Sequence, residues 1–352
     1  MQARVERLVT KIEEAGLGGL LVTEAKNIFY LTGFSGTAGT VFVSPKRRIF
    51  VTDDRYALIA KQTIQGFDII STRTALTEIA NAIADDGLET LGFEDTVSYQ
   101  FYQALKAAFP HQDLQAQTNF VEGLRIIKDA DEAAIIRRAC QISDQAFIDA
   151  LDFIKPGKTE LEVANFLDFR MRELGASGIS FDTIAASGFR SAMPHGRASD
   201  KVIEAGESLT LDFGCYYQHY ASDMTRTVHV GHVTDEEREI YAVTLAANQA
   251  LIDQARAGMT YIDFDRVPRQ LIEDKGYGAN FTHGIGHGLG LDVHELPFFT
   301  KTADELKPGM VVTDEPGIYL DGLYGVRIED DLLITETGCE VLTLAPKELI
   351  VL

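Results

Sequence analysis

The segment Thr282–Glu295 reads THGIGHGLGLDVHE and contains three histidines, His283, His287 and His294. Two histidines four residues apart could bind zinc from one face of a helix. Glycine at every second position between 284 and 290 argues against a helix, because each glycine costs about 1 kcal/mol relative to alanine in a helix interior. Alternating glycine instead favours an extended segment that other groups approach closely. We therefore expect one of these histidines to bind a metal, with carboxylates supplied from elsewhere in the chain.

The size and composition of the chain limit the classes of protein to consider. Its 352 residues suffice for two domains of about 100–200 residues each. A net charge of −21 disfavours binding to the phosphate backbone of nucleic acids. The three cysteines are far apart and form no CxxC pair, so we expect no disulfide framework. The N-terminus lacks an apolar signal region and no stretch approaches about 18 apolar residues, so we expect a cytoplasmic protein without a membrane span.

The pattern of predicted elements changes near residue 123. Residues 1–123 alternate short helices and strands, including a helix over 2–15, which predicts an α/β domain with a mixed sheet. Residues 124–352 begin with a long helix over 131–153 and a second helix that starts with the capping box TELE at 159–162. Beyond residue 179 the pattern predicts mostly strands and turns, with two further helices. We place the domain boundary between residues 123 and 124.

Two strands of the second region carry aspartates in apolar surroundings. The stretch 209–214 reads LTLDFG, and its alternation puts Asp212 on the face opposite three apolar side chains. The stretch 222–231 reads SDMTRTVHVG, contains Asp223 and is expected to pair antiparallel with the first strand. Two adjacent carboxylates repel each other unless one is protonated or a cation lies between them. From these strands alone, a metal site and a structural pairing with a buried arginine both remain open.

Two glutamates occur in similar strand contexts further along the chain. Residues 313–319 read TDEPGIY, where the following proline holds Glu315 extended. Residues 326–331 read VRIEDD and run on into apolar residues, which predicts one strand with Arg327 and Glu329 on the same face. A simple ion pair between these two is the alternative for Glu329, but it leaves the recurrence of such carboxylates unexplained. Two neighbouring acids are interpreted as exposed residues or turn formers: Asp314 and Asp330.

Four buried-looking carboxylates and one imidazole make a chemically coherent set of ligands. Such a set suits Mn²⁺, and it suits Co²⁺, Fe²⁺ or Zn²⁺ less exclusively. Two carboxylates that bridge ions about 3.5–4 Å apart would make a two-metal hydrolytic site.

The order of LDFG, SDMTRT, HGIGHGLG, DEPGIY and VRIED resembles that of the metallopeptidases with the creatinase, or pita-bread, fold. The resemblance is greatest to aminopeptidase P and prolidase. It covers the whole chain, because these enzymes carry an N-terminal α/β domain before the catalytic one. It implies an α+β protein with a creatinase-type domain over 1–123 and a pita-bread catalytic domain over 124–352. NIFYLTGFSGTAGT and KDADEAAIIRRA are similar to segments of the short bacterial aminopeptidase P type.

The resemblance also implies a role for each candidate residue. Two divalent metal ions, Mn²⁺ before Co²⁺ or Zn²⁺, would be held by five residues: Asp212, Asp223, His287, Glu315 and Glu329. Among these, Asp212 would bind one ion, His287 and Glu315 the other, and Asp223 and Glu329 both. Further catalytic or substrate-site residues would be His195, His294, His283 and Arg327. Glu315 would also transfer the proton of the nucleophile.

The activity implied by the resemblance is that of an Xaa-Pro aminopeptidase. A hydroxide between the two metal ions would release the first residue from peptides with proline in second position. Prolidase, which cleaves only Xaa-Pro dipeptides, is the alternative, and it must read the free carboxylate with a basic residue that the sequence does not locate. The N-terminal domain argues against methionine aminopeptidase. A non-catalytic protein-binding relative should have lost ligands, and all five are present. The expected partners are peptides and a second copy in a homodimer, with neither nucleic acid nor membrane.

Overall fold

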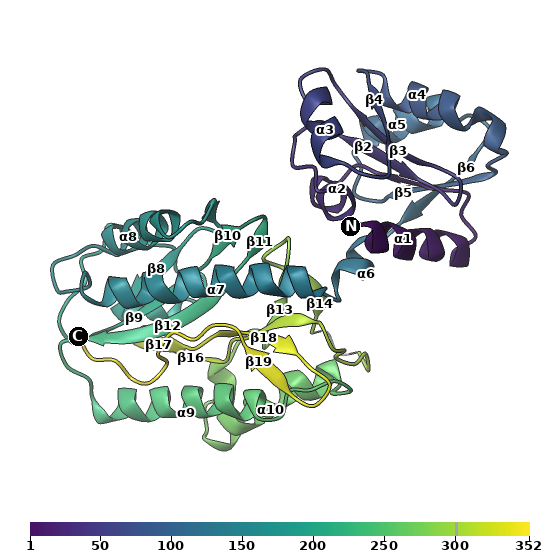
Figure 1. Ribbon diagram of the computed structural model, residues 1–352. Helices are drawn as coiled ribbons and strands as arrows, with labels where there is room; N and C mark the ends of the chain where they lie inside the picture. Colours follow the sequence, from purple (N-terminus) through teal and green to yellow (C-terminus); the bar gives the residue numbers. More distant parts are fainter. Residues whose placement is uncertain (300–301) are drawn as a thin grey trace. The chain divides into compact units, whose positions relative to one another are not determined.

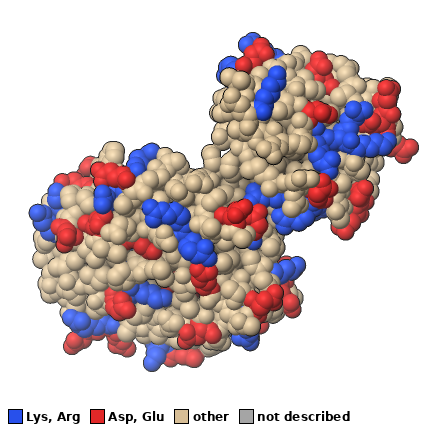
Figure 2. Space-filling view, viewed as in Figure 1, with Lys and Arg blue, Asp and Glu red and all other residues tan. Residues whose placement is uncertain are grey.

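The computed structural model describes residues 1–299 and 302–352, which form two compact units, 1–125 and 126–352 (Figure 1). Figure 2 shows acidic and basic side chains interspersed on the visible surface of each unit. In the described ranges, no helix combines the length and the apolar character needed to cross a membrane.

The first unit is built on a six-stranded mixed sheet with the strand order β4-β3-β2-β1-β5-β6. Strand β1 pairs antiparallel with β2 and parallel with β5, which confirms the predicted mixed α/β domain. Helices α4 and α5 pack on the sheet through Ile79, Ile83 and Leu105. The elements are α1 (Gln2–Glu14), β1 (Leu20–Val22), α2 (Ala25–Thr32), β2 (Thr40–Val43), β3 (Arg48–Thr52), α3 (Ala57–Thr63), β4 (Asp68–Ser71), α4 (Ala75–Ile83), η1 (Ala84–Asp86), β5 (Thr90–Glu94), α5 (Tyr99–Ala108), β6 (Asp113–Gln117) and α6 (Glu122–Arg125).

The strands of the second unit lie between two pairs of helices, α7 and α8 on one side and α9 and α10 on the other (Figure 1). The elements are α7 (Ala130–Leu151), α8 (Glu160–Glu173), β7 (Gly178–Ile179), β8 (Ile184–Ser187), η2 (Gly188–Ala192), β9 (Glu207–Phe213), β10 (Cys215–Tyr217), β11 (Tyr220–Ala221), β12 (Met224–Val230), α9 (Asp235–Ile252), α10 (Tyr261–Asp274), η3 (Gly278–Asn280), β13 (His287–Gly288), β14 (Glu295–Phe298), β15 (Val311–Asp314), β16 (Gly317–Leu320), β17 (Tyr324–Arg327), β18 (Asp330–Ile334) and β19 (Cys339–Val341).

The helices of this unit begin within one residue of the predicted positions. Thr159 and Glu162 form the predicted capping box of α8, in which each side chain accepts a hydrogen bond from the backbone of the other residue. The same device starts α7 at Asp129. The apolar residues of α7 and α8 pack with Leu209, Leu211 and Phe213 of β9, so the alternation read in LTLDFG directs one face of that strand into the core.

The segment after β16 differs from the prediction of one continuous strand. β17 pairs with β16, whereas β18 pairs with β15 and β19 in another sheet. Between these strands, the N–H of Glu329 donates to the carbonyl oxygen of Thr225 at 3.0 Å, so the chain crosses there to β12. Glu329 therefore lies at a change of sheet.

Asp314 and Asp330 are fully buried, so their interpretation as exposed residues or turn formers is wrong. Asp330 pairs with Arg226 and Lys347, each at 2.8 Å. Asn248 donates to Oδ2 of both aspartates, at 3.2 Å for Asp314 and 3.1 Å for Asp330. Their partners come from distant segments, which is why local sequence context gives no sign of the burial.

Candidate metal centre and substrate pocket

The predicted antiparallel pair of aspartate strands is confirmed. β9 and β12 pair with Asp212 opposite Thr225, and Asp223 lies immediately before β12. The two carboxylates thereby come together at one end of the ladder. This placement requires both the alternation of β9 and the short β10–β11 hairpin that returns the chain.

The glycine-rich segment is not a helix, as its alternation predicts, and its extended part is the short strand β13. β13 pairs antiparallel with both β14 and β15. A Cβ atom at Gly286 would overlap the carbonyl oxygen of Thr313, and one at Gly288 would overlap the carbonyl group of Leu296. The absence of side chains lets the backbone that carries His287 lie directly against its neighbours.

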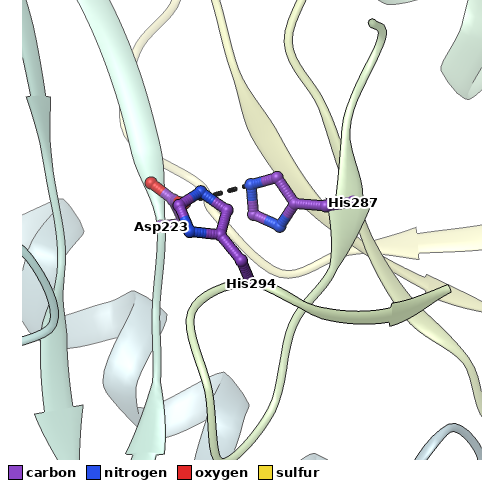
Figure 3. A group of neighbouring side chains, drawn as sticks. All are labelled: Asp223, His287 and His294. Carbon is purple, nitrogen blue, oxygen red and sulfur yellow. Dashed lines mark ion pairs between the residues drawn. The ribbon is translucent and has the colours of Figure 1, made fainter. Parts of the chain in front are cut away.

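Three groups of side chains bring possible ligand atoms within 4.8 Å of one another. The groups are Asp212, Asp223 and Glu329; His287, Glu315 and Glu329; and Asp223, His287 and His294. Figure 3 shows the last group, in which both imidazole rings lie beside the Asp223 carboxylate. Nε2 of His287 is 3.7 Å from Oδ2 of Asp223 and 3.7 Å from Oε1 of Glu315. Asp223, His287 and Glu329 each belong to two of the three groups.

The carboxylates of this cluster fit divalent metal ions. Oδ1 of Asp212 and Oδ1 of Asp223 are buried and accept no hydrogen bond from the described part of the chain. Burial raises the pKa of Asp223 well above its usual value, and the nearby Glu329 and Asp212 raise it further. Burial likewise raises the pKa of Glu315 to about 8. Carboxylates this close repel one another unless protons or cations intervene, and hard oxygen donors are what Mn²⁺ accepts.

His287 is arranged to offer a lone pair to a metal. Burial lowers its pKa to about 4, and the neighbouring His294 contributes to this shift, so the ring is neutral near pH 7. Nδ1 lies 3.1 Å from the carbonyl oxygen of Gly288, an acceptor that assigns the ring proton to Nδ1. The lone pair of Nε2 then faces the carboxylates.

Arg327 is held by three side chains, and Glu329 is not among them. Its guanidinium donates to Oδ2 of Asp212 at 2.6 Å, to the hydroxyl of Tyr319 at 2.8 Å and to Oγ1 of Thr225 at 3.0 Å. Oγ1 of Thr225 in turn donates to Oε2 of Glu329 at 2.6 Å. The alternative of a simple ion pair between Arg327 and Glu329 is therefore wrong. Thr225 of the neighbouring strand β12 lies between the two side chains and forms a hydrogen bond with each of them.

The remaining predicted histidines line the same pocket, which has a volume of about 500 Å³. The rings of His294 and His287 contact each other at a centroid distance of 4.2 Å. Nε2 of His283 lies 2.8 Å from the Tyr319 hydroxyl, and burial lowers the pKa of His283 to about 4. His195 lines the pocket from the loop after η2. All nine predicted site residues thus surround one cavity.

Comparison with known proteins identifies the family. Residues 134–336 match metallopeptidase family M24, and residues 4–127 match the creatinase/prolidase N-terminal domain. The chain belongs to metallopeptidase family M24. This confirms the resemblance read from the five motifs and the predicted creatinase-type and pita-bread domains of an α+β protein. Membership of M24 also makes the chain a hydrolase that uses divalent metal ions.

Three relatives of this M24 peptidase cover nearly its whole length. An Xaa-Pro dipeptidase of Pyrococcus furiosus is 38% identical over 99% of this chain and 100% of its own. The solved structure of an Xaa-Pro dipeptidase from Bacillus anthracis is 45% identical, with a TM-score of 0.97 over 100% of this chain and 99% of that one. The structure of an X-Pro aminopeptidase from Thermotoga maritima is 37% identical, with a TM-score of 0.90 over 99% of each chain.

Sequence reasoning missed several residues of the M24 site. Tyr319 links His283 to Arg327, and its only sequence signal is its place at the end of TDEPGIY. Thr225 lies two residues after Asp223, so period-2 alternation could have assigned it to the site. The remaining lining residues outside the prediction include three apolar side chains and one charged pair: Phe181, Ile184, Phe298, Asp182 and Arg197.

Proposed function

We propose that this M24 metallopeptidase is an Xaa-Pro dipeptidase, or prolidase, which hydrolyses the bond before the proline of a dipeptide. The observation that carries the proposal is whole-length similarity, at 45% and 38% identity, to proteins described as Xaa-Pro dipeptidases. The sequence alone put aminopeptidase P first and prolidase second, and the comparisons favour the reverse order. The 37% identity to an X-Pro aminopeptidase keeps that activity as the second candidate.

The cluster would hold two divalent ions, which we propose to be Mn²⁺, with Co²⁺ or Zn²⁺ as alternatives. Asp212 would bind one ion, His287 and Glu315 the other, and Asp223 and Glu329 both. When bound, the ions would polarise the scissile carbonyl and lower the pKa of the attacking water. Metal analysis together with chelation tests this assignment. Full turnover by protein freed of metal would contradict it.

The side chains around the ions would orient the substrate and move protons. His294 and His195 would donate hydrogen bonds to the carbonyl oxygen as it gains negative charge. The Glu315 carboxylate would accept a proton from the attacking water and pass it to the proline nitrogen. That nitrogen is a tertiary amide in the substrate, so it must gain a proton to leave as a secondary amine. Arg327 would hold Asp212 and Tyr319 in place.

Peptide length distinguishes the two candidate activities. We expect the Mn²⁺-loaded protein to hydrolyse Xaa-Pro and to leave Xaa-Pro-Yaa peptides with the same first residue largely uncut. Comparable kcat/KM values for the two substrates would show that the protein is an Xaa-Pro aminopeptidase and not a dipeptidase. The homodimer and the cytoplasmic location stay predictions.

A further inference from the structure

The substrate pocket contains two arginines among its described lining residues, Arg327 and Arg197. The side chain of Arg327 is only 3% exposed and is engaged by Asp212, Tyr319 and Thr225. The side chain of Arg197 is 77% exposed. Its NH1 lies 3.2 Å from Oδ2 of Asp182, whose side chain is 66% exposed. Arg197 is therefore the guanidinium that an incoming anion can reach.

The backbone that carries Arg197 is held firmly although its side chain is exposed. Its carbonyl oxygen accepts a hydrogen bond from NH2 of Arg190 at 2.6 Å, and Arg190 pairs with the fully buried Glu160 at 3.0 Å. Its N–H donates to the carbonyl oxygen of His195 at 2.9 Å, and it forms an antiparallel bridge with Ile184. The guanidinium therefore extends from a fixed point two residues from a proposed substrate histidine.

The charges of the pocket favour one orientation for a small peptide. Four carboxylates form the cluster at the metal centre, and two divalent ions would balance their charge, so this end of the pocket carries no net positive charge for a substrate carboxylate. The free carboxylate of a dipeptide needs a cation elsewhere in the pocket, and the planar guanidinium of arginine can bind a carboxylate through two parallel hydrogen bonds. In a longer peptide or an amide, a neutral group takes the place of that carboxylate.

We propose that Arg197 binds the C-terminal carboxylate of the Xaa-Pro substrate and so selects dipeptides. The inference rests on the proposed prolidase function. In the free protein the Asp182 carboxylate pairs with the Arg197 guanidinium, and the substrate carboxylate takes the place of Asp182. Arg197 is a specificity residue in this scheme and takes no part in bond cleavage.

The test compares an Xaa-Pro dipeptide with the corresponding Xaa-Pro amide, which differs only by the missing negative charge. In the Mn²⁺-loaded enzyme, Arg197→Met should lower kcat/KM for the dipeptide about ten-fold, mainly through KM, and leave the amide within about two-fold. The kcat/KM of Arg197→Lys for the dipeptide should lie between the values for the wild-type enzyme and Arg197→Met. Asp182→Asn removes the competing carboxylate and should lower KM for the dipeptide.

Arg266→Met is the matched control, because Arg266 is 68% exposed and pairs with Asp263 at 2.7 Å but lies on α10, outside the pocket lining. Arg266→Met should leave kcat/KM unchanged for both the dipeptide and the amide. Equal losses of dipeptide and amide activity in Arg197→Met, or no loss in either, would overturn the proposal.

Calorimetric binding of the same two compounds to the metal-free protein, which should not hydrolyse them, gives a readout without turnover. The wild-type protein should bind the dipeptide about ten-fold more tightly than the amide, and Arg197→Met should bind both alike. If the wild-type enzyme cleaves tripeptides as well as dipeptides, the prolidase assignment fails, whereas the ratio of dipeptide to amide still decides the role of Arg197. A wild-type protein that binds dipeptide and amide equally would exclude that role.

Discussion

Glu315 has two proposed roles, as a metal ligand and as the group that transfers the proton. Glu315→Gln keeps the volume of the side chain but removes its charge and its basicity. We expect kcat of the Mn²⁺-loaded enzyme to fall about 10²- to 10⁴-fold, the range typical of general acid–base catalysis. Since the variant relieves repulsion within the carboxylate cluster, metal-free protein should unfold at the same or higher urea concentration.

The exposed Glu336 provides a control for this substitution, because it lies in a turn after β18. Glu336→Gln should leave kcat unchanged. A Glu315→Gln protein that retains more than about a tenth of the wild-type turnover would remove Glu315 from the proton-transfer step.

Within the glycine-rich segment, neighbouring positions differ in the space that they offer. A Cβ at Gly288 would overlap the Leu296 carbonyl group, whereas a Cβ at Gly284 would meet no heavy atom within 4 Å. Gly288→Ala should lower the free energy of unfolding by about 1–3 kcal/mol, the usual cost of overpacking. Gly284→Ala should change it by less than about 0.5 kcal/mol. Urea unfolding of both variants measures the difference, and equal values would show that close approach does not explain the glycine at 288.

The loop that carries His294 is tied to the segment before α7 by a buried ion pair. Nζ of Lys128 lies 2.9 Å from Oε1 of Glu295, and their side chains are 1% and 5% exposed. Lys128→Met leaves the carboxylate buried without this partner, so we expect a loss of about 3–5 kcal/mol in the free energy of unfolding.

Arg137 and Glu340 offer an exposed pair for comparison, at 2.8 Å with side chains 36% and 44% exposed. Arg137→Met should cost no more than about 1 kcal/mol. If both substitutions had the same small effect, the Lys128–Glu295 pair would not hold the loop.

For the molecule as a whole, buried acids should make the stability of the metal-free protein depend on pH. Burial raises the pKa of both Glu315 and Asp331 to about 8, from ordinary values of 4.5 and 3.8. Between these limits the folded state binds more protons than the unfolded state, so the free energy of unfolding falls as pH rises. His283 and His287, with pKa values lowered from 6.5 to about 4, act oppositely, but only below about pH 6.5. The net fall should therefore be clearest between pH 6.5 and 8.

Metal should weaken this dependence. Ligand carboxylates are deprotonated when they bind an ion, so Glu315 in the loaded protein no longer takes up a proton on folding. Urea unfolding at pH 6.5 and pH 8, with chelator and with Mn²⁺, tests both statements. We expect a decrease with pH in the chelated protein and a smaller one in the loaded protein. A chelated protein that gains stability over this range would contradict the pKa shifts.

Much of the fold and the aspartate pair of the candidate site can be predicted from local patterns, whereas the roles of the histidines came from the family resemblance. Alternation along β9 and β12 predicted that Asp212 and Asp223 come together, and alternating glycine predicted that the segment with His287, which includes the short strand β13, is not a helix. Capping residues predicted where α8 begins. These predictions succeed because each concerns one element or two consecutive strands, where backbone geometry relates sequence spacing directly to position.

Tertiary structure alone decided which distant groups meet. Arg327 and Asp212 are separated by 115 residues, yet they pair at 2.6 Å, whereas the only partner that the sequence suggested for Arg327, as an alternative, was Glu329. Asp314 and Asp330 are buried because Asn248, Arg226 and Lys347 reach them from other segments. The sequence by itself determined which side chains share a face of β9 and β12, the order of the motifs and, through them, the family. Periodicity within an element carries no information about what packs against it, so the partners of the buried charges had to come from the structure.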